Sequence, residues 1–458
     1  MSLSSLLGIA RSALLAQKRA MEVTANNVAN AQTPGYSRQR LEMESAPGIR
    51  TADGLVGRGV TTGMVTRSRD MFYDDTFRRE NGLFSQSNTL QQGLRQIEDA
   101  IGEPSPTGIT ASIDRLFHSF ADLANDPASP SARDLVCQAG DRLANQLNQL
   151  DTRLTIASSD AMTRIDAEVG QANELLRRIG KLNQDILSSG GKAAVDLQDQ
   201  RDAALDQLSS FMSVRVVRHD DGTVSVMGEE SNLVDGSRAT QLSVTGSPPA
   251  IGIVDSGGVP VARIGGSLGG ACEMVNTRVP AMRAQLDQLA SNLVSQVNAV
   301  HRTGYTATGA TGTDFFDPSD VTAGSICITG ALKASSMAVA ASGTNQAGDG
   351  SIALAMSKLG SAPIAALGQR SFRDFYSGVA ANVGLAVTGA QTDTDVQQAL
   401  VDQADQQRTA VSGVSVDEEM VNLMQQQQAY GAARSEEHTS ELQSQFRIVC
   451  RLLLEKKK

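Results

Sequence analysis

The chain has 458 residues, of which 40% are hydrophobic and only 3% aromatic, and it contains no Trp. This length allows about two or three domains, whose cores must rest on aliphatic side chains, as in long helices packed side by side. The formal net charge of −10 argues against nucleic-acid binding, which requires clustered Lys and Arg. We therefore interpret the short basic runs as solvated faces or interface charges: Arg38/Arg40, Arg67/Arg69 and Arg78/Arg79.

The first predicted helix covers residues 3–30, where apolar side chains recur at helical spacing. It ends near Asn30, because Asn tolerates left-handed backbone geometry and Thr33-Pro34-Gly35 has the composition of a turn. An extended stretch follows through Leu41. The apolar stripe and its two polar members are Leu3, Leu6, Leu7, Ala10, Leu14, Gln17, Met21, Thr24 and Val28.

Helical periodicity resumes near Asp70 and continues to about Ser209, with breaks at glycine and proline positions. From Val214 the pattern changes to short Val and Ile runs separated by Gly, Ser and Pro. Asp221-Gly222 lies between two of these runs, which predicts a β-hairpin. The Gly265–Gly270 run has no following Lys-Ser/Thr that would hold phosphates, and we interpret it as a hinge at a domain border.

Helices return over residues 271–301, and a Gly/Thr/Ala-rich connector covers 304–350. Within this part, Phe315-Phe316 is interpreted as a buried clamp, and His301 as a core-edge or cap residue. Three further helices are predicted near residues 351–360, 371–388 and 393–411.

The last predicted helix opens with the polar segment Ser412 to Glu419 and carries a second apolar stripe. Two amphipathic helices at the chain ends that lack an internal partner cover each other or a neighbouring subunit. This indicates an assembly protein. The second stripe consists of Val416, Met420, Leu423, Met424, Gln427 and Tyr430.

The element order predicts an α+β fold in which the long terminal helices pair as an α-helical coiled-coil domain, next to an elongated helical middle domain with a small inserted β-rich domain. We expect the coiled-coil domain to be discontinuous. The predicted boundaries are 1–45 plus 405–434 for the terminal domain, 46–213 plus 265–404 for the middle domain, 214–264 for the β-rich insert, and 435–458 for a non-native tail.

The run Ala25 to Tyr36 resembles the N-terminal signature of the bacterial flagellar rod, hook and hook-associated proteins. Ser37-Arg38-Gln39 narrows the resemblance to the hook-associated proteins of the hook–filament junction, and so do Asp126–Arg133, Asp199–Leu208 and Val297–His301. Ser412–Met420 with Gln428-Ala429-Tyr430 is similar to the family's C-terminal signature. The resemblance covers Met1 to about Arg434.

The resemblance implies a secreted structural subunit that polymerises as a ring between hook and filament and is exported by the flagellar type III route without a cleaved signal peptide. Its implied partners are further copies of itself, the hook protein, a second hook-associated protein and an export chaperone at the C-terminal helix. The implied assembly interface consists of Leu3, Leu6, Leu7, Leu14, Met21, Val28, Asn26, Asn27, Asn30, Pro34, Gly35, Tyr36, Val416, Met420, Leu423, Met424 and Tyr430.

Past Arg434 the apolar stripe of the last helix is not continued, and Arg434 to Ser444 resembles the translation of a DNA-sequencing adapter. We interpret residues 435–458 as replacing the last native turns, which would weaken polymerisation and chaperone binding. Apolar periodicity reappears on a rotated face at Leu442, Phe446, Val449 and Leu453.

The chemistry of a catalytic or metal site is not found in the sequence. The Cys and His residues are dispersed, without CxxC or ligand spacing, so we expect no catalytic residue, cofactor or metal. No stretch approaches the roughly 18 uncharged apolar residues of a membrane span, and Arg11 interrupts the N-terminal apolar stretch of a chain without a basic leader. Three alternatives stay open: another axial protein of the rod and hook class, a peptidoglycan hydrolase on a flagellar scaffold, and a surface adhesin that acts through the β-rich insert.

Overall fold

A computed structural model of the chain describes residues 3–51, 54–229 and 231–455. The fold is mostly helical, with a few small antiparallel sheets. It divides into a terminal unit, residues 1–81, 172–241 and 399–458, and a central unit, residues 82–171 and 242–398. Three long helices contribute residues to both units: α2 (Met71–Ile101), α4 (Pro130–Ser188) and α10 (Phe372–Ser412).

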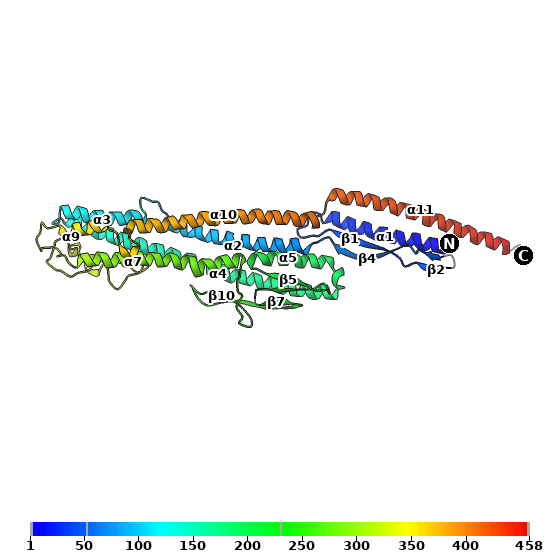
Figure 1. The fold of residues 1–458 in the computed structure, drawn as a ribbon, viewed down its shortest axis with the longest axis horizontal. Helices are drawn as coiled ribbons and strands as arrows, with labels where there is room; N and C mark the ends of the chain where they lie inside the picture. Colours follow the sequence, from blue (N-terminus) through cyan, green and yellow to red (C-terminus); the bar gives the residue numbers. More distant parts are fainter. Residues whose placement is uncertain (1–2, 52–53, 230, 456–458) are drawn as a thin grey trace. The chain divides into compact units, whose positions relative to one another are not determined.

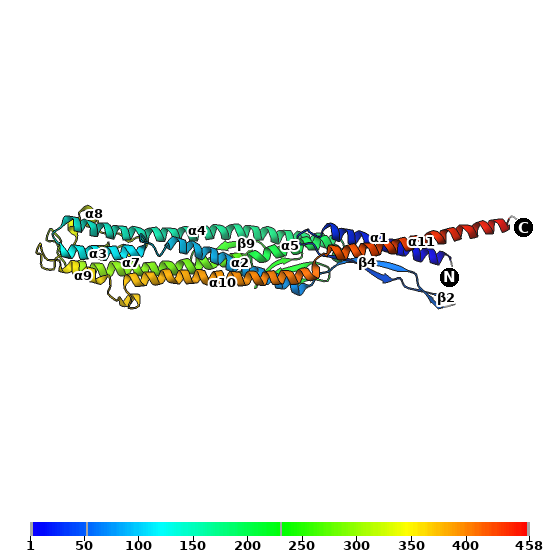
Figure 2. The ribbon, with the colours of Figure 1, turned by 90° about the horizontal axis from the view of Figure 1, so that it is seen from above.

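The terminal unit brings the two ends of the chain together. Helix α1 (Leu3–Ala29) lies beside α11 (Val416–Glu455), as the two views in Figures 1 and 2 show. Strands β1 (Gln39–Ser45) and β4 (Val60–Arg67) form an antiparallel ribbon that contacts α1, and β2 (Ile49–Thr51) pairs with β3 (Gly54–Val56). The predicted first helix, and the prediction that the terminal helices contact each other, are confirmed.

Small side chains form the buried face of α1. Ala16, Ala20 and Thr24 follow one another at a spacing of four residues and are at most 4% exposed. The neighbouring loop approaches closely at Gly59, where an added Cβ would lie 2.2 Å from Ser12 Oγ and where φ is +93°. Helix α1 therefore packs within its own chain through small residues, and most of the Leu stripe is left half-buried.

The other part of the terminal unit is α5 (Val195–Phe211), with a four-stranded meander in the order β5-β6-β7-β8. Arg218 pairs with Val224 across the turn at Asp221-Gly222, which confirms the predicted hairpin. Asn183 of α4 fixes the sheet, since its Nδ2 donates at 2.7 Å to the carbonyl oxygens of Val224 and Gly236. The strands are β5 (Arg215–Arg218), β6 (Val224–Met227), β7 (Asn232–Asp235) and β8 (Arg238–Ala239).

The central unit contains one hydrophobic core between helices. Phe315 and Phe316 are fully buried with ring centroids 4.9 Å apart, which confirms the predicted clamp. His301 is fully buried as well: its Nδ1 contacts the Thr313 carbonyl at 2.7 Å, and its Nε2 accepts from the Ala340 N–H at 2.9 Å. The shorter helices are α3 (Ile109–Asn125), α7 (Val279–His301), α8 (Gly330–Ala334) and α9 (Ser351–Leu359).

Two local predictions are wrong. The helices predicted over 371–388 and 393–411 are one helix, α10, because a single Gly389 costs only about 1 kcal/mol in a helix. The Gly265–Gly270 run is not a hinge, since Gly266 begins α6 (Gly266–Glu273), which continues through a π-helical turn into α7. Gly270 permits close packing there: an added Cβ would lie 2.5 Å from the Gln86 carbonyl oxygen.

The strands within residues 214–264 belong to two sheets. Strands β5 to β8 lie in the terminal unit, whereas β9 (Leu242–Thr245) and β10 (Gly252–Asp255) form a separate two-stranded sheet and belong to the central unit. Asn276 holds the second sheet through two hydrogen bonds of 2.8 Å to the backbone of Ile251. None of the described helices has the length and hydropathy that crossing a bilayer would demand.

Candidate functional site

The N-terminal signature forms a hydrogen-bonded junction between three segments of the terminal unit. Asn27 is 1% exposed, and its Nδ2 donates to the Gln39 carbonyl at 2.9 Å and to Glu419 Oε2 at 3.0 Å. Its Oδ1 accepts from the Gln39 N–H and the Tyr36 hydroxyl, both at 2.9 Å. The amide therefore joins α1, β1 and α11, a role that requires both a donor and an acceptor.

Arg38 ties the same loop to the ends of two other helices. Its Nε and Nη2 lie 2.8 and 2.7 Å from Glu419 Oε1, and its Nη1 lies 3.0 Å from Glu418 Oε2. Its backbone N–H donates to the carbonyl of Ser412, the last residue of α10, at 2.9 Å. Glu419 is 2% exposed, so this ion pair is largely shielded from water.

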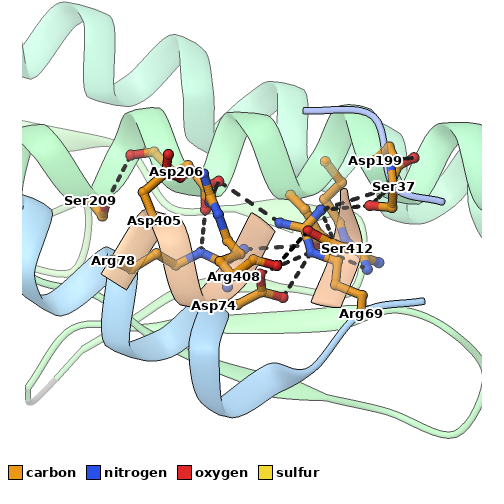
Figure 3. Close-up of polar contacts among 12 residues, drawn as sticks. Ser37, Arg69, Asp74, Arg78, Asp199, Asp206, Ser209, Asp405, Arg408 and Ser412 are labelled. Atoms are coloured by element: carbon orange, nitrogen blue, oxygen red, sulfur yellow. Dashed lines mark hydrogen bonds and ion pairs between the residues drawn. The ribbon is translucent and has the colours of Figure 1, made fainter. Parts of the chain in front are cut away.

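A buried cluster of arginines and aspartates lies next to this junction, and Figure 3 shows part of it. Asp206 accepts from Arg78 at 2.7 Å and from Arg408 at 2.6 Å, and Arg69 Nε lies 2.9 Å from Asp74. We define the arginine–aspartate cluster by its eight members, which come from β4, the β4–α2 loop, α2, α5 and α10: Arg67, Arg69, Arg78, Arg408, Asp74, Asp199, Asp202 and Asp206.

The cluster also holds the N-terminal loop. Ser37 donates to Asp199 through its N–H at 3.0 Å and through its hydroxyl at 2.7 Å. Arg67 reaches the same carboxylate at 2.6 Å and Asp202 at 2.9 Å. Four stretches that are distant in sequence, namely the loop at Ser37, residues 67–78, α5 and α10, are thus linked by charge-assisted hydrogen bonds, which are stronger than neutral ones.

Burial and charge act in opposite directions on Asp202. Burial alone would raise the pKa of its carboxyl, but Arg69, Arg67, Arg78 and Arg201 outweigh burial and hold that pKa well below its usual range. The pKa of the Tyr36 phenol is raised, first by burial and then by nearby carboxylates. Both groups therefore keep a fixed protonation state near neutral pH.

Arg67, Arg69 and Arg78 were interpreted as solvated faces or interface charges, and the first of these alternatives is wrong for all three. Their side chains are 3–8% exposed because each faces aspartates from α5 or α2. The spacing of Asp199, Asp202 and Asp206 places them on one charged face of a helix, but spacing does not show that the arginines lie opposite. Glu419 was not among the predicted site residues, and its signal was its place in the acidic first turn of α11.

The predicted assembly interface is partly open in the single chain. Leu6, Val416, Met420 and Met424 are 43–53% exposed. The remaining members divide by burial: Asn27 is buried, Pro34 and Gly35 are exposed, and the side chain of Leu3 lies outside the described residues. Half-buried members are Leu7, Leu14, Met21, Val28, Asn26, Asn30, Tyr36, Leu423 and Tyr430.

Two exposed apolar residues of these helices were not predicted. Leu15 is 61% and Val421 48% exposed, and each is adjacent in sequence to a member of a predicted stripe. The exposed apolar surface of the terminal helices is therefore wider than the stripes alone. Isolated exposed apolar residues are ordinary, but contiguous ones mark interaction surfaces.

One group of possible metal ligands occurs in the central unit. Single ligand atoms of Asp317, Asp320 and Cys327 lie within 4.8 Å of one another. The Asp317 carboxylate accepts from the Ser319 N–H and hydroxyl, and the Cys327 thiol lies 3.8 Å from Asp320 Oδ2. These bonds explain the grouping as a loop held by its own side chains.

Comparison with known protein families places both chain ends in one class. Residues 7–36 match the model described as flagella basal body rod protein, and residues 405–433 match flagellar basal body rod FlgEFG protein C-terminal. Residues 94–316 match the flagellar hook-associated protein FlgK helical domain. The segments that meet in the terminal unit therefore carry the signatures of flagellar rod and hook proteins.

Relatives with similar sequences show which flagellar family the chain belongs to. Flagellar hook-associated protein 1 of Bacillus subtilis is 31% identical over 484 aligned positions, which cover 94% of this chain and 95% of the relative. The Salmonella typhimurium protein of that name is 30% identical over 329 positions, covering 69% of this chain and 59% of the relative. The chain belongs to the family of flagellar hook-associated protein 1.

A solved structure has the same fold. It is titled as the flagellar hook junction protein FlgK from Burkholderia pseudomallei, and it matches with a TM-score of 0.65 at 18% identity, covering 74% of this chain and all of that one. The predicted family and its role are confirmed: the chain is a structural protein of the bacterial flagellum at the hook–filament junction.

Proposed function

We propose that the chain performs this role by polymerising as a ring, in which α1 and α11 pair as a coiled coil and complete their apolar faces against neighbouring copies. The exposure of Met420 and Met424 on α11 and of Leu6 on α1 supports the proposal most directly. These side chains lie on the two helices that carry the rod and hook signatures.

Burial of these faces would contribute favourably to association. Full burial of one Leu- or Met-sized side chain contributes about 1.5–3 kcal/mol, so covering a half-exposed one contributes about half of that. The four predicted residues that are 43–53% exposed would together add several kcal/mol per copy. Because every copy in a ring makes the same contact with the next copy, this free energy is gained at each contact around the ring.

The remaining partners follow from the family. We propose that the ring contacts the hook protein on one side and a second hook-associated protein on the other, and that α11 binds an export chaperone before assembly. Export through the flagellar channel without a cleaved signal peptide agrees with this scheme. The chain acts by assembly rather than by catalysis.

The C-terminal tail should weaken polymerisation and chaperone binding of this chain. Leu442, Phe446 and Val449 are 53–73% exposed on α11, and the C-terminal family match ends at residue 433. We propose that residues 435–458 replace native turns of this helix. Resequencing the locus tests this, and an uninterrupted reading frame through the tail would refute it.

The assembly proposal is tested by complementing a strain that lacks its junction protein. A Met420→Gln/Met424→Gln variant should be secreted but leave the cells with few filaments and little swimming. Ile156→Gln is the matched control, because Ile156 is 53% exposed on α4, outside the proposed interface. Wild-type swimming by the double variant would contradict the proposal, as would equal loss in the control.

A further inference from the structure

A cavity of about 420 Å³ in the terminal unit is lined by several cationic side chains among neutral and apolar ones. It lies among the end of β4, the loop that precedes α5, α5 itself and the β5–β6 turn. Its volume is within the range of about 300–1,000 Å³ that is usual for small-molecule sites. The ionisable side chains that line it are Arg67, Arg69, Lys192, Arg201, Arg218, His219 and Asp220.

The carboxylates that pair with these arginines do not line the cavity. Arg69 and Arg218 share Asp74, with contacts of 2.9 and 3.0 Å. Arg67 and Arg201 share Asp202, with contacts of 2.9 and 3.7 Å. The four arginines thus line the cavity, whereas the carboxylates that pair with them do not.

The carboxylates near the wall are shared between arginines. The four guanidinium groups of the wall contact Asp74, Asp199 and Asp202 within 3.7 Å. Asp206 lies 3.9 Å from Arg69 but is paired at 2.7 and 2.6 Å with Arg78 and Arg408. None of the four guanidinium groups of the wall therefore has a carboxylate to itself.

Arg201 has a donor that no protein group uses. Its side chain is 2% exposed, and its Nη1 donates to the Gly222 carbonyl at 2.6 Å. Its buried Nε has no hydrogen-bond partner among the described residues. An unused donor on a buried guanidinium is costly unless a ligand or water accepts from it.

The charge on Arg201 is disfavoured by its surroundings. Burial and repulsion from Arg67, Arg218 and Arg78, against the attraction of Asp202, lower the pKa of its guanidinium to about 10. A negative charge in the cavity would stabilise the charged guanidinium against both effects.

The mouth of the cavity carries an exposed ion pair. Lys192 Nζ lies 3.7 Å from Asp220 Oδ1, and the Lys192 side chain is 58% exposed. This pair is weak in water, so Lys192 is available to a ligand at little cost. His219 is engaged through Nε2 with the Ser225 hydroxyl at 2.8 Å.

We propose that this cavity binds a small oxyanion that carries carboxylate or phosphate groups, held by Arg201 and Arg218 inside and by Lys192 at the mouth. The anion is either free in solution or part of an acidic side chain of another protein. In both cases the binding chemistry is the same: guanidinium donors directed at oxygen atoms.

The test uses the full chain, isothermal titration calorimetry at constant ionic strength, and three probes: phosphate, citrate and a short oligoglutamate peptide. We expect at least one probe to bind with a Kd of about 1 mM or below. Arg218→Gln should weaken that binding about tenfold, and Lys192→Gln about threefold. Arg215→Gln is the matched control, because Arg215 is exposed on the same strand and does not line the cavity.

The variants are chosen so that misfolding does not hide the result. Arg218 also pairs with Asp74, so circular dichroism must show that Arg218→Gln is folded, whereas the exposed Lys192 can be replaced without loss of a buried contact. Preference for phosphate, citrate or the peptide identifies the source of the anion. The proposal is overturned if no probe binds, or if Arg215→Gln weakens binding as much as the two cavity variants.

Discussion

Replacing Glu419 by Gln tests whether the junction between α1, the N-terminal loop and α11 depends on one buried charge. Glu419 accepts from Arg38 at 2.7 and 2.8 Å and from Asn27 at 3.0 Å, and its side chain is 3% exposed. Glutamine has the same shape and keeps one oxygen acceptor, but it removes the negative charge that faces Arg38.

The expected loss can be estimated from the contacts. Removing one partner of a fully buried ion pair costs about 3–5 kcal/mol, whereas an exposed pair is worth about 0–1 kcal/mol. Arg38 is 15% exposed and keeps its contact with Glu418, which is 64% exposed. We therefore expect a loss of about 2 kcal/mol, which is a factor of about 30 in the equilibrium for separating α11 from α1.

Hydrogen–deuterium exchange measures this equilibrium locally, because amides in α1 and in the first turns of α11 exchange when the two helices separate. Glu419→Gln should raise their exchange rates by about 30-fold and leave the amides of α7 unchanged. Glu418→Gln is the control, since it removes the exposed carboxylate of the same arginine. Equal effects of the two substitutions would refute the assignment of the junction to a buried charge.

Three further predictions concern stability. Asp202→Asn should lower the free energy of unfolding by about 3–5 kcal/mol near neutral pH. Because its folded pKa is depressed, this contribution is present above the unfolded value of about 3.9 and disappears below it, so thermal unfolding curves of variant and wild type should converge in acid. Gly270→Ala should destabilise by about 1–3 kcal/mol in urea unfolding, because its Cβ would lie 2.5 Å from a backbone oxygen, whereas Gly269→Ala, with its nearest neighbour at 3.6 Å, should not. Burial lowers the pKa of His301, so stability should fall as the pH drops below the unfolded value of about 6.5, and His301→Gln should flatten that decline between about pH 7 and pH 5; an unchanged slope would show that His301 is not the group that titrates.

Local patterns predicted much of the secondary structure. The first helix, the hairpin at Asp221-Gly222 and the buried Phe315-Phe316 pair follow from spacing and turn composition, which act over a few residues. The break predicted near residue 390 was wrong, because burial of Val387 and Ala390 favours a continuous helix, and spacing alone does not show this.

The candidate site was predicted less completely, because its contacts join residues that are far apart in sequence. Asn27 belongs to a signature that could be recognised, but its partner Glu419 lies 392 residues away. The arginines at 67, 69 and 78 gave no sign of burial until the aspartates of α5 were placed opposite them. A charged side chain considered by itself is expected to be exposed to solvent. The fold shows which charged side chains are paired and therefore buried.

The pairing of Arg38 with Glu419 has a consequence for the order in which the molecule matures. The two residues are 381 positions apart, so the contact cannot form until synthesis has passed residue 419. A product terminated before that residue would contain Arg38 without its buried partner. The N-terminal loop of such a fragment would therefore lack the ion pair that fixes it in the longer chain.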